Sequence, residues 1–273
     1  MFNRRAWLRR GVWRSLATCF LSTSFVCTAQ TAHAEELNVA VAANFLGTLQ
    51  KLAVLFQRAQ GHTIVPSSGS SGQLYAQIQR GAPFDVLLSA DAERPAKLEA
   101  EGLAVKGTRF TYARGRLILW SPKPGVVDSA GGVLKRSDLQ FVALPDPKVA
   151  PYGVAAEQVL TALKLLAPLR AASKIVLGES VGQAHQFAVS GHADCAFIAL
   201  AQVIDPAGKV PGSSWQIPES LYSRIDQDAL VLSASQKQAV ARAFLTWLRS
   251  DRAALDTIRS SGYANADKAT STQ

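Results

Sequence analysis

Four short segments of the chain place small or hydroxyl residues directly before a run with helical spacing. The first N–H groups of a helix have no partner within it, and the helix dipole adds partial positive charge at that end. Small residues let the backbone approach a ligand closely. Such helix starts, gathered at the carboxyl ends of parallel strands, predict an anion site that needs no Lys or Arg. The segments are Ala42-Ala43-Asn44, Ser68-Gly69-Ser70-Ser71-Gly72, Pro151-Tyr152-Gly153 and Gly178-Glu179-Ser180-Val181-Gly182.

Each segment taken alone has a simpler interpretation. Asn44 is a common N-cap residue and suits the start of its own helix. The Ser/Gly loop at 67–72 suits an ordinary turn. It does not match a P-loop, because Gly72 is followed by Gln73-Leu74 and not by Lys-Ser or Lys-Thr. The anion-site prediction gains weight because all four segments occur in the same strand-to-helix setting.

The last segment also fits the Gly-x-Ser-x-Gly turn that carries the nucleophile of α/β-hydrolases. That fold needs an acid and then a histidine after Ser180. The histidines that follow are His185 and His192, with no Asp or Glu between Ser180 and His192. The required order is therefore not met, and a secreted serine hydrolase using Ser180 is a minor alternative.

Metal ligands show no usable spacing in the sequence. The histidines beyond residue 34 are scattered and Cys195 has no partner cysteine nearby, so no zinc pattern is present. We expect four aspartates to cap helices or turns instead. No redox or nucleotide cofactor has a fingerprint here, so we expect none. The residues concerned are His62, His185, His192, Cys195, Asp85, Asp91, Asp146 and Asp194.

The elements that would position these segments alternate between strand and helix. This alternation predicts an α/β fold with mainly parallel sheets covered on both faces. The predicted strands are 37–41, 63–65, 84–88, 116–120, 141–144, 174–177 and 195–200. The predicted helices are 45–60, 74–79, 92–98, 154–166, 181–190, 235–250 and 251–260.

The first 34 residues have the pattern of a signal peptide. Five arginines and no acid precede an uncharged stretch that ends in Ala32-His33-Ala34, the small-x-small pattern of a cleavage site. We expect cleavage after Ala34 and a periplasmic destination. Arg4-Arg5 also resembles a twin-arginine export signal. An uncleaved anchor is the alternative, but the uncharged stretch is diluted by Ser and Thr, whereas a span needs about 20 strongly apolar residues.

Removing this leader changes the charge and the cysteine content. The chain has 29 Lys and Arg against 20 Asp and Glu, and the five leader arginines reduce the remainder to 24 against 20, a net charge of +4 instead of +9. The basic excess is therefore no argument for nucleic-acid binding, which we exclude. Cys19 and Cys27 lie in the leader, so Cys195 would have no intramolecular disulfide partner.

Residues 36–263 resemble the periplasmic molybdate-binding proteins, with matching motifs in the same order. The resemblance implies a type II periplasmic binding protein fold, with two α/β lobes and a ligand cleft between them. One lobe would comprise 35–114 plus 223–273, and the other 115–222. The motifs are Val39 to Phe45, the Ser/Gly loop, Gly81 to Val86, Ser89-Ala90-Asp91, Pro145-Asp146-Pro147, Pro151-Tyr152-Gly153, Glu179-Ser180-Val181 and Phe197 to Gln202.

The resemblance also implies the residues that hold the anion. Asn44 and Ser71 would offer side-chain and backbone donors. Ala90, Tyr152 and Val181 would each offer a backbone N–H, and Ala43 would add a contact. No protein atom would ligate the metal directly, because these residues bind the oxyanion through its oxygens. The complete set is Ala43, Asn44, Ser71, Ala90, Tyr152 and Val181.

Two departures from the family pattern concern ligand preference. Ala199 stands where a familiar version has a donor Tyr, and Asn44 stands where it has Ser. We therefore do not rank molybdate, tungstate and sulfate by affinity. A cleft lined by donors would reject hydrogen phosphate, since its proton would lack an acceptor. Sulfate would be rejected by size, because its shorter bonds leave donors out of reach.

The resemblance implies a transport function and no catalysis. The chain would capture molybdate, and also tungstate, and deliver it to the membrane permease of an ABC importer. It would need no cofactor, bind no nucleic acid and be a monomer. The alternative within the same fold is a binder of another oxyanion such as sulfate.

Overall fold

The computed structural model describes residues 34–266, which belong to one compact unit. The predicted leader, apart from Ala34, lies outside the described residues, so its cleavage and its export route stay predictions. In the described part of the chain, no helix is long and apolar enough to cross a membrane.

Two five-stranded sheets form the framework of this unit. The first has the order β2-β1-β3-β10-β4, with β1 parallel to β2 and β3, and β10 antiparallel to β3 and β4. Its strands are β1 (Glu36–Ala42), β2 (Thr63–Gly69), β3 (Val86–Leu88), β4 (Phe110–Gly115) and β10 (Ile225–Val231).

The second sheet has the order β7-β6-β8-β5-β9. Strand β6 is parallel to β7 and β8, whereas β5 is antiparallel to β8 and β9. Its strands are β5 (Leu117–Ser121), β6 (Val142–Pro145), β7 (Ile175–Gly178), β8 (Cys195–Ala199) and β9 (Ser213–Gln216). Both sheets are thus mixed, and the prediction of mainly parallel sheets was wrong.

The chain passes between the sheets at two places. Strand β4 ends at Gly115 and β5 begins at Leu117, so Arg116 alone joins the first sheet to the second. The return runs through 217–224, between β9 and β10. The antiparallel pairs are made by strands beside these two passages: β10 pairs with β3 and β4, and β5 pairs with β8 and β9.

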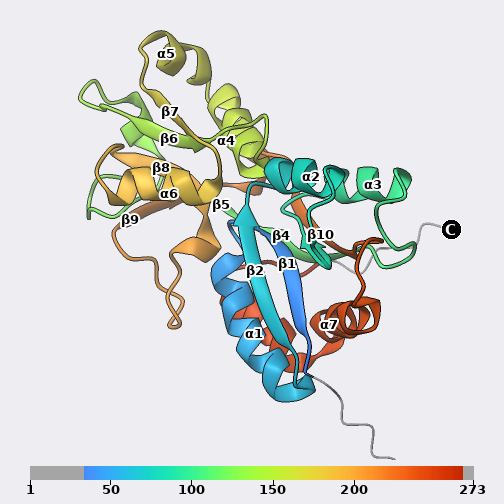
Figure 1. The fold of residues 1–273 in the computed structure, drawn as a ribbon. Coiled ribbons are helices and arrows are strands. Elements are labelled where there is room, and N and C mark those ends of the chain that lie inside the picture. The colour runs from blue at the N-terminus through green and yellow to red at the C-terminus, as the bar shows by residue number, and fades with distance from the viewer. Residues whose placement is uncertain (1–33, 267–273) are drawn as a thin grey trace, which may run out of the picture. The chain divides into compact units, whose positions relative to one another are not determined.

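Helices cover both faces of the first sheet. Alternate residues of β1 point to opposite faces: Leu37, Val39 and Val41 join a core that includes residues of α1, α7 and α8, whereas Ala40 packs with Leu74 of α2 and Leu98 of α3. Figure 1 shows α1 and α7 below this sheet and α2 and α3 above it. The helices are α1 (Leu46–Gln60), α2 (Ser71–Gln79), α3 (Glu93–Ala100), α7 (Gln238–Ser250) and α8 (Arg252–Ser260).

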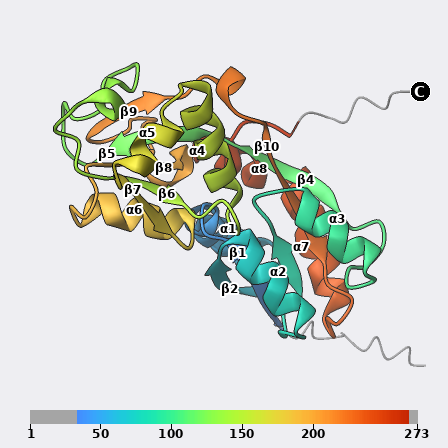
Figure 2. The same ribbon diagram turned by 90° about the horizontal axis from the view of Figure 1, so that it is seen from above.

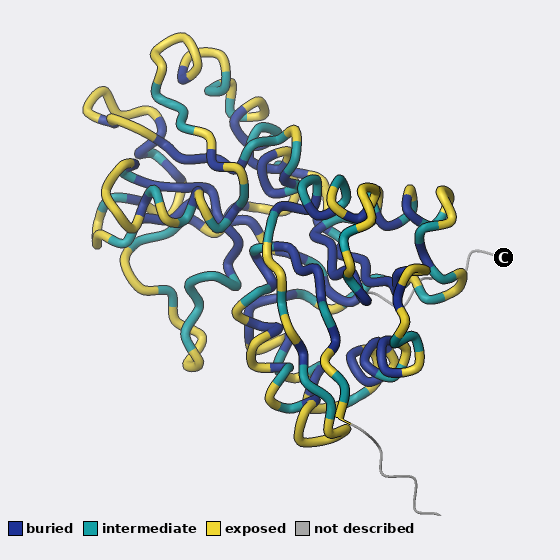
Figure 3. Tube along the Cα trace, viewed as in Figure 1, coloured by how far each residue is buried: buried dark blue, intermediate teal, exposed yellow. Residues whose placement is uncertain are grey.

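The second sheet packs with its own helices in one large core, which includes residues of α4 and α6 (Figure 2). Strands β5, β6 and β8 are buried along their whole length, whereas the outer strands β7 and β9 are mostly intermediate or exposed. In Figure 3 buried segments are dark blue, and many helical turns are yellow where they are exposed. The helices are α4 (Pro151–Ala162), α5 (Leu166–Ala171) and α6 (Val181–Val189), and short 3₁₀ turns are η1 (Gly132–Lys135), η2 (Leu200–Gln202) and η3 (Glu219–Leu221).

Several predicted boundaries shift for local reasons. Helix α4 begins at Pro151, not at 154, because proline is favoured in the first turn of a helix. The predicted helix 154–166 breaks at Lys164, whose φ of 58° is left-handed, and α5 follows as a separate helix. Helix α1 begins at Leu46, and α7 begins at Gln238 instead of 235.

Candidate anion-binding site

A small cavity lies where β1, β2 and β3 end and where α2, α4 and α6 begin. All six residues that the sequence analysis singled out line it, and they come from segments of both sheets. The lining residues are Ala42, Ala43, Asn44, Gly69, Ser70, Ser71, Ala90, Ala150, Pro151, Tyr152 and Val181.

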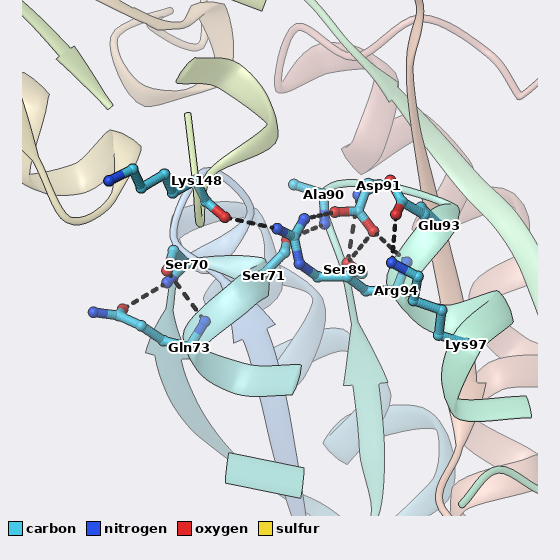
Figure 4. Close-up of polar contacts among 10 residues, drawn as sticks. All are labelled: Ser70, Ser71, Gln73, Ser89, Ala90, Asp91, Glu93, Arg94, Lys97 and Lys148. Carbon is cyan, nitrogen blue, oxygen red and sulfur yellow. Dashed lines mark hydrogen bonds and ion pairs between the residues drawn. The ribbon is translucent and has the colours of Figure 1, made fainter. Parts of the chain in front are cut away.

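The start of α2 leaves one backbone N–H for the cavity. Ser70 caps the helix: its hydroxyl accepts from Gln73 N at 3.4 Å, and its own N–H donates to Gln73 Oε1 at 3.1 Å. Gly72 N donates to Val149 O at 2.9 Å. The N–H of Ser71 therefore has no acceptor within the described chain, although Ser71 is only 1% exposed. Figure 4 shows this capping geometry.

The hydroxyl of Ser71 is oriented by Ala90. Ala90 N donates to Ser71 Oγ at 2.9 Å, a bond that is drawn in Figure 4. The Ala90 N–H is thus bonded to Ser71 in this structure, and its expected bond to the anion stays a prediction. Because a lone pair of Ser71 Oγ is taken, the hydroxyl proton points elsewhere and is available to a ligand.

The turn after β1 leaves a second backbone N–H. Ala43 N donates to Gly69 O at 2.9 Å, and Phe45 N donates to Ala42 O at 2.8 Å. Ala43 therefore offers the cavity its side chain and not its N–H. The N–H of Asn44, between them, meets no acceptor among residues 34–266.

The side chain of Asn44 does not cap α1, whose N-cap is Phe45 without a side-chain bond. Its Nδ2 donates to Gln227 Oε1 at 3.0 Å and to the Tyr263 hydroxyl at 3.1 Å. Both amide protons are thus used inside the protein, and a side-chain bond from Asn44 to the anion stays a prediction. Asn44 Oδ1 is buried and has no donor in the described structure.

Two helix starts associated with the second sheet complete the lining. In α4, Pro151 has no N–H, and Gly153 N donates to Ala150 O at 2.9 Å. The N–H of Tyr152, between them, has no acceptor within the described residues. In α6, Ser180 Oγ accepts from Gln183 N at 3.2 Å. The N–H of Val181, the first residue of α6, also has no acceptor within the described residues.

The cavity is electropositive without a cationic side chain. No Lys, Arg or His is among its lining residues, and the described residues contain no cluster of three His, Cys, Asp or Glu that could hold a metal. The starts of α2, α4 and α6 supply partial positive charge. Burial raises the pKa of Tyr152 well above its ordinary value, so its hydroxyl stays protonated near neutral pH.

Ser180 has the environment of a helix cap and not of a nucleophile. In the described structure its hydroxyl is bonded to Gln183 N, and neither histidine that follows it is hydrogen-bonded to it. His185 faces the ring of Trp120, and His192 Nδ1 lies 2.7 Å from the Ser190 hydroxyl. The geometry offers Ser180 no general base.

Two of the four aspartates that were predicted to cap helices or turns do so. Asp91 accepts from Arg94 N at 3.0 Å, and Asp146 accepts from Lys148 N at 2.9 Å. Asp194 and Asp85 instead join separate segments: Asp194 accepts from Gln140 N at 2.7 Å, and Asp85 accepts from Asn38 N and from the Ser235 hydroxyl.

A buried polar layer beneath the cavity was missed by the sequence analysis. Gln227, Tyr112 and Tyr263 are at most 5% exposed and are linked to Asn44 and Tyr152 by hydrogen bonds. Strand β10, which carries Gln227, was not predicted. No local motif marks these residues, because their partners lie far away in sequence.

Ala199 lies at the end of β8, is fully buried, and is absent from the cavity lining. Its N–H donates to Gln202 Oε1 at 3.0 Å, and Gln202 Nε2 donates to Val181 O at 3.2 Å. The residue therefore acts on the start of α6 only through Gln202.

Comparisons with known proteins match this architecture. The model of the family described as bacterial extracellular solute-binding protein matches residues 37–264. The molybdate-binding protein ModA of Azotobacter vinelandii is 45% identical over 237 residues, which are 87% of this chain and 92% of that protein. The ModA of Rhodobacter capsulatus is 48% identical over 232 residues, or 85% and 89% of the two chains.

A solved structure agrees in fold. The periplasmic molybdate-binding protein of Azotobacter vinelandii matches with a TM-score of 0.82 at 48% identity, covering 84% of this chain and 99% of that one. These relatives are named as binding proteins and not as enzymes, which excludes the hydrolase alternative. The chain therefore belongs to the bacterial extracellular solute-binding proteins and, among them, to the family of the molybdate-binding proteins.

Proposed function

We propose that the chain captures molybdate in this cavity as the periplasmic binding component of an ABC importer. The observation that carries the proposal is the set of unpaired donors: the backbone N–H groups of Asn44, Ser71, Tyr152 and Val181, and the Ser71 hydroxyl, meet no protein acceptor within the described residues. A buried donor without an acceptor is costly. An anion that accepts from all of them removes that cost.

The chemistry of the donors favours a fully ionised tetrahedral oxyanion. Molybdate near neutral pH only accepts hydrogen bonds, and bonds to a charged acceptor are stronger than neutral ones. Tungstate has the same charge and shape, so we include it in the proposal. Hydrogen phosphate keeps a proton that needs an acceptor, and leaving it unpaired costs about 1–3 kcal/mol.

One lining residue makes the phosphate comparison informative. Asn44 Oδ1 is the side-chain acceptor of the lining that has no donor in the described structure. If it faces the ligand, it supplies the acceptor that hydrogen phosphate needs. Phosphate binding therefore tests the selectivity argument separately from molybdate binding.

The two sheets support the proposal of two lobes. We assign 35–114 plus 223–273 to one lobe and 115–222 to the other, since the chain passes between the sheets near these boundaries. Asn44 and Ser71 would bind from the first lobe, and Tyr152 and Val181 from the second. Closure of the lobes on the anion would then present the loaded form to the membrane permease. A monomer that is exported by a cleaved leader completes the proposal.

Isothermal titration of residues 35–273 with molybdate, tungstate, sulfate and phosphate tests the function. We expect tight one-to-one binding of molybdate and tungstate, weak binding of sulfate and none of phosphate. Tight sulfate binding would favour the alternative oxyanion function. Absence of binding to all four ions would contradict the proposed function while leaving the fold unaffected.

A further inference from the structure

We propose that Gln227 is a positioning residue for the anion, which ties the two halves of the cavity together without touching the ligand. This inference rests on the proposed function. Gln227 is fully buried and does not line the cavity. It is hydrogen-bonded to two residues that do, Asn44 and Tyr152.

A bulge in β4 lies beside Gln227 of β10. Gln227 pairs with Ala113 and Asp228 with Thr111, so Tyr112 of β4 is the extra residue and its hydroxyl reaches Gln227 Oε1. Such bulges leave a residue unpaired, bend the strand and re-aim a side chain, often beside a functional site. A carboxamide in a fully buried position must use both its ends, since each unpaired atom is costly.

Both ends of this carboxamide are used. Oε1 accepts from Asn44 Nδ2 at 3.0 Å and from the Tyr112 hydroxyl at 3.0 Å. Nε2 donates to the Tyr152 hydroxyl at 3.2 Å. Asn44 and Tyr112 are attached to the first sheet, whereas Tyr152 belongs to α4, which packs on the second. The Gln227–Tyr152 bond therefore joins the two halves.

The two residues held by Gln227 are also two of the proposed anion donors. Asn44 and Tyr152 each have a backbone N–H without a protein acceptor within residues 34–266. Their side chains, at 3% and 1% exposed, are fixed from below by the same carboxamide. Ligand-binding groups bind well only when neighbouring residues hold them within about 0.5 Å of the required geometry. Gln227 is placed to set the spacing between these two donors.

The bond lies at the link between the sheets. A Cβ built on Gly115, the last residue of β4, would collide with the Tyr152 hydroxyl and lie 2.7 Å from Gln227 Nε2. The missing side chain at Gly115 thus lets Gln227 and Tyr152 meet directly over the residue that leads into the second sheet. A rotation of one half against the other at this link would strain or break the bond, so the bond favours the arrangement in which the donors converge.

Two substitutions each remove the Gln227–Tyr152 hydrogen bond, one by changing the donor and the other by changing the acceptor. Gln227→Met keeps the length of the side chain but loses the carboxamide. Tyr152→Phe loses only the hydroxyl and keeps the ring and the backbone N–H. We expect each to raise the molybdate Kd by roughly 5- to 30-fold. Most of the change should lie in the dissociation rate, because the donors of the free protein still meet the ion but hold it less well.

The double variant separates this role from independent losses. If Gln227 and Tyr152 act through one shared bond, the double variant binds molybdate about as well as the weaker single variant. If the increase in molybdate Kd of the double variant equals the product of the two single increases, the proposal is overturned. So would parent-like dissociation rates in both single variants, provided that thermal melts show them folded.

Tyr112→Phe is the matched control for general loosening. It removes a hydroxyl that also donates to Gln227 Oε1, but from the same sheet as Gln227. We expect a lower melting temperature without ligand and a molybdate Kd within about twofold of the parent. Equal weakening by Tyr112→Phe and Tyr152→Phe would overturn the proposal.

The parent protein, measured in the same series, reports on the proposed function separately. If the parent binds another of the four oxyanions instead of molybdate, the proposed ligand is wrong, and the same variant ratios are measured with that ion. If the parent binds none of them, this inference falls with the proposed function. If the parent binds and the variants bind equally well, only this inference fails.

Discussion

Ser71 offers the cavity both a backbone donor and a hydroxyl. Its backbone N–H is unpaired at the start of α2 within the described structure, and its hydroxyl accepts from Ala90 N at 2.9 Å. The accepted bond fixes the oxygen and directs its proton away from Ala90. Ala90 is thereby linked to the cavity through Ser71, and a direct bond from its N–H to the anion stays a prediction.

We expect Ser71→Ala to weaken molybdate binding by about 1–3 kcal/mol, or roughly 5- to 150-fold in Kd, because a bond to a charged group is lost and the Ala90 N–H is orphaned. Isothermal titration measures this. Ser67→Ala, an exposed serine on β2 outside the cavity lining, is the matched control and should leave Kd unchanged. Equal Kd values for Ser71→Ala and the parent would show that the hydroxyl is not a donor.

Cys195 illustrates a reactive residue type in an inert environment. It is fully buried in β8, and burial, with a smaller effect of the Asp194 carboxylate, raises the pKa of its thiol to about 12. The thiol therefore stays protonated below that pH, and the thiolate is the species that alkylating reagents attack.

At pH 8 we expect iodoacetamide to leave Cys195 unmodified in the folded protein and to modify it fully in guanidinium chloride. Mass mapping of the peptide that contains Cys195 measures this. Modification of the folded protein at the rate of the unfolded chain would mean that β8 is accessible or that the thiol ionises near its ordinary pKa.

At the scale of elements, the helix starts around the cavity were predictable, whereas strands β4, β9 and β10 were not. The segments around Asn44, Ser71, Tyr152 and Val181 carry local signals, namely small residues, caps and a proline. Strands β4 and β10 were not predicted because charged residues interrupt their runs of apolar residues, and charged residues are depleted in strands.

Those charges have partners across the sheet. Arg109, just before β4, lies 2.8 Å from Asp228 of β10, and Arg114 lies 3.3 Å from Asp226. The sequence pattern does not reveal an ion pair between residues more than a hundred positions apart. Gln227 was not predicted for the same reason, since its partners Asn44 and Tyr152 lie 183 and 75 positions away.

Substitutions at two glycines measure whether binding depends on the close approach of α2 to the Val149 segment. Gly72 lies in the first turn of α2, and a Cβ there would lie 2.9 Å from Val149 Cα. Gly47 lies in the first turn of α1, is exposed, and has open space around an added Cβ.

We expect Gly72→Ala to push the Val149 segment away and to weaken molybdate binding at least roughly tenfold, since the α4 start that follows this segment moves with it. Gly47→Ala should leave Kd unchanged and stabilise the protein by about 0.5–1 kcal/mol, the usual gain on replacing a helical glycine. Titration and thermal melts of both variants decide. Unchanged binding in Gly72→Ala would mean that the two segments separate without cost.

At the scale of the whole molecule, the cavity takes donors from segments of both sheets, so an anion in it contacts both halves at once. A ligand shifts a conformational equilibrium only by its differential affinity for the two states. Donors from one half alone would bind an open form as well as a closed one. On the proposed function, the division of donors, Asn44 and Ser71 against Tyr152 and Val181, would give the ion a preference for the closed form.

Molybdate should therefore both stabilise and contract the protein. At a free concentration of about 100 times Kd, binding adds about 2.7 kcal/mol to the free energy of unfolding, or roughly 5–10 °C in melting temperature for a chain of this size. Small-angle X-ray scattering should show a smaller radius of gyration with molybdate than without it. Ser71→Ala, measured below its own Kd, is the control and should neither melt higher nor contract. Stabilisation without contraction would place the donors in one rigid arrangement that is already closed, and the anion would then report its presence to a permease by charge alone.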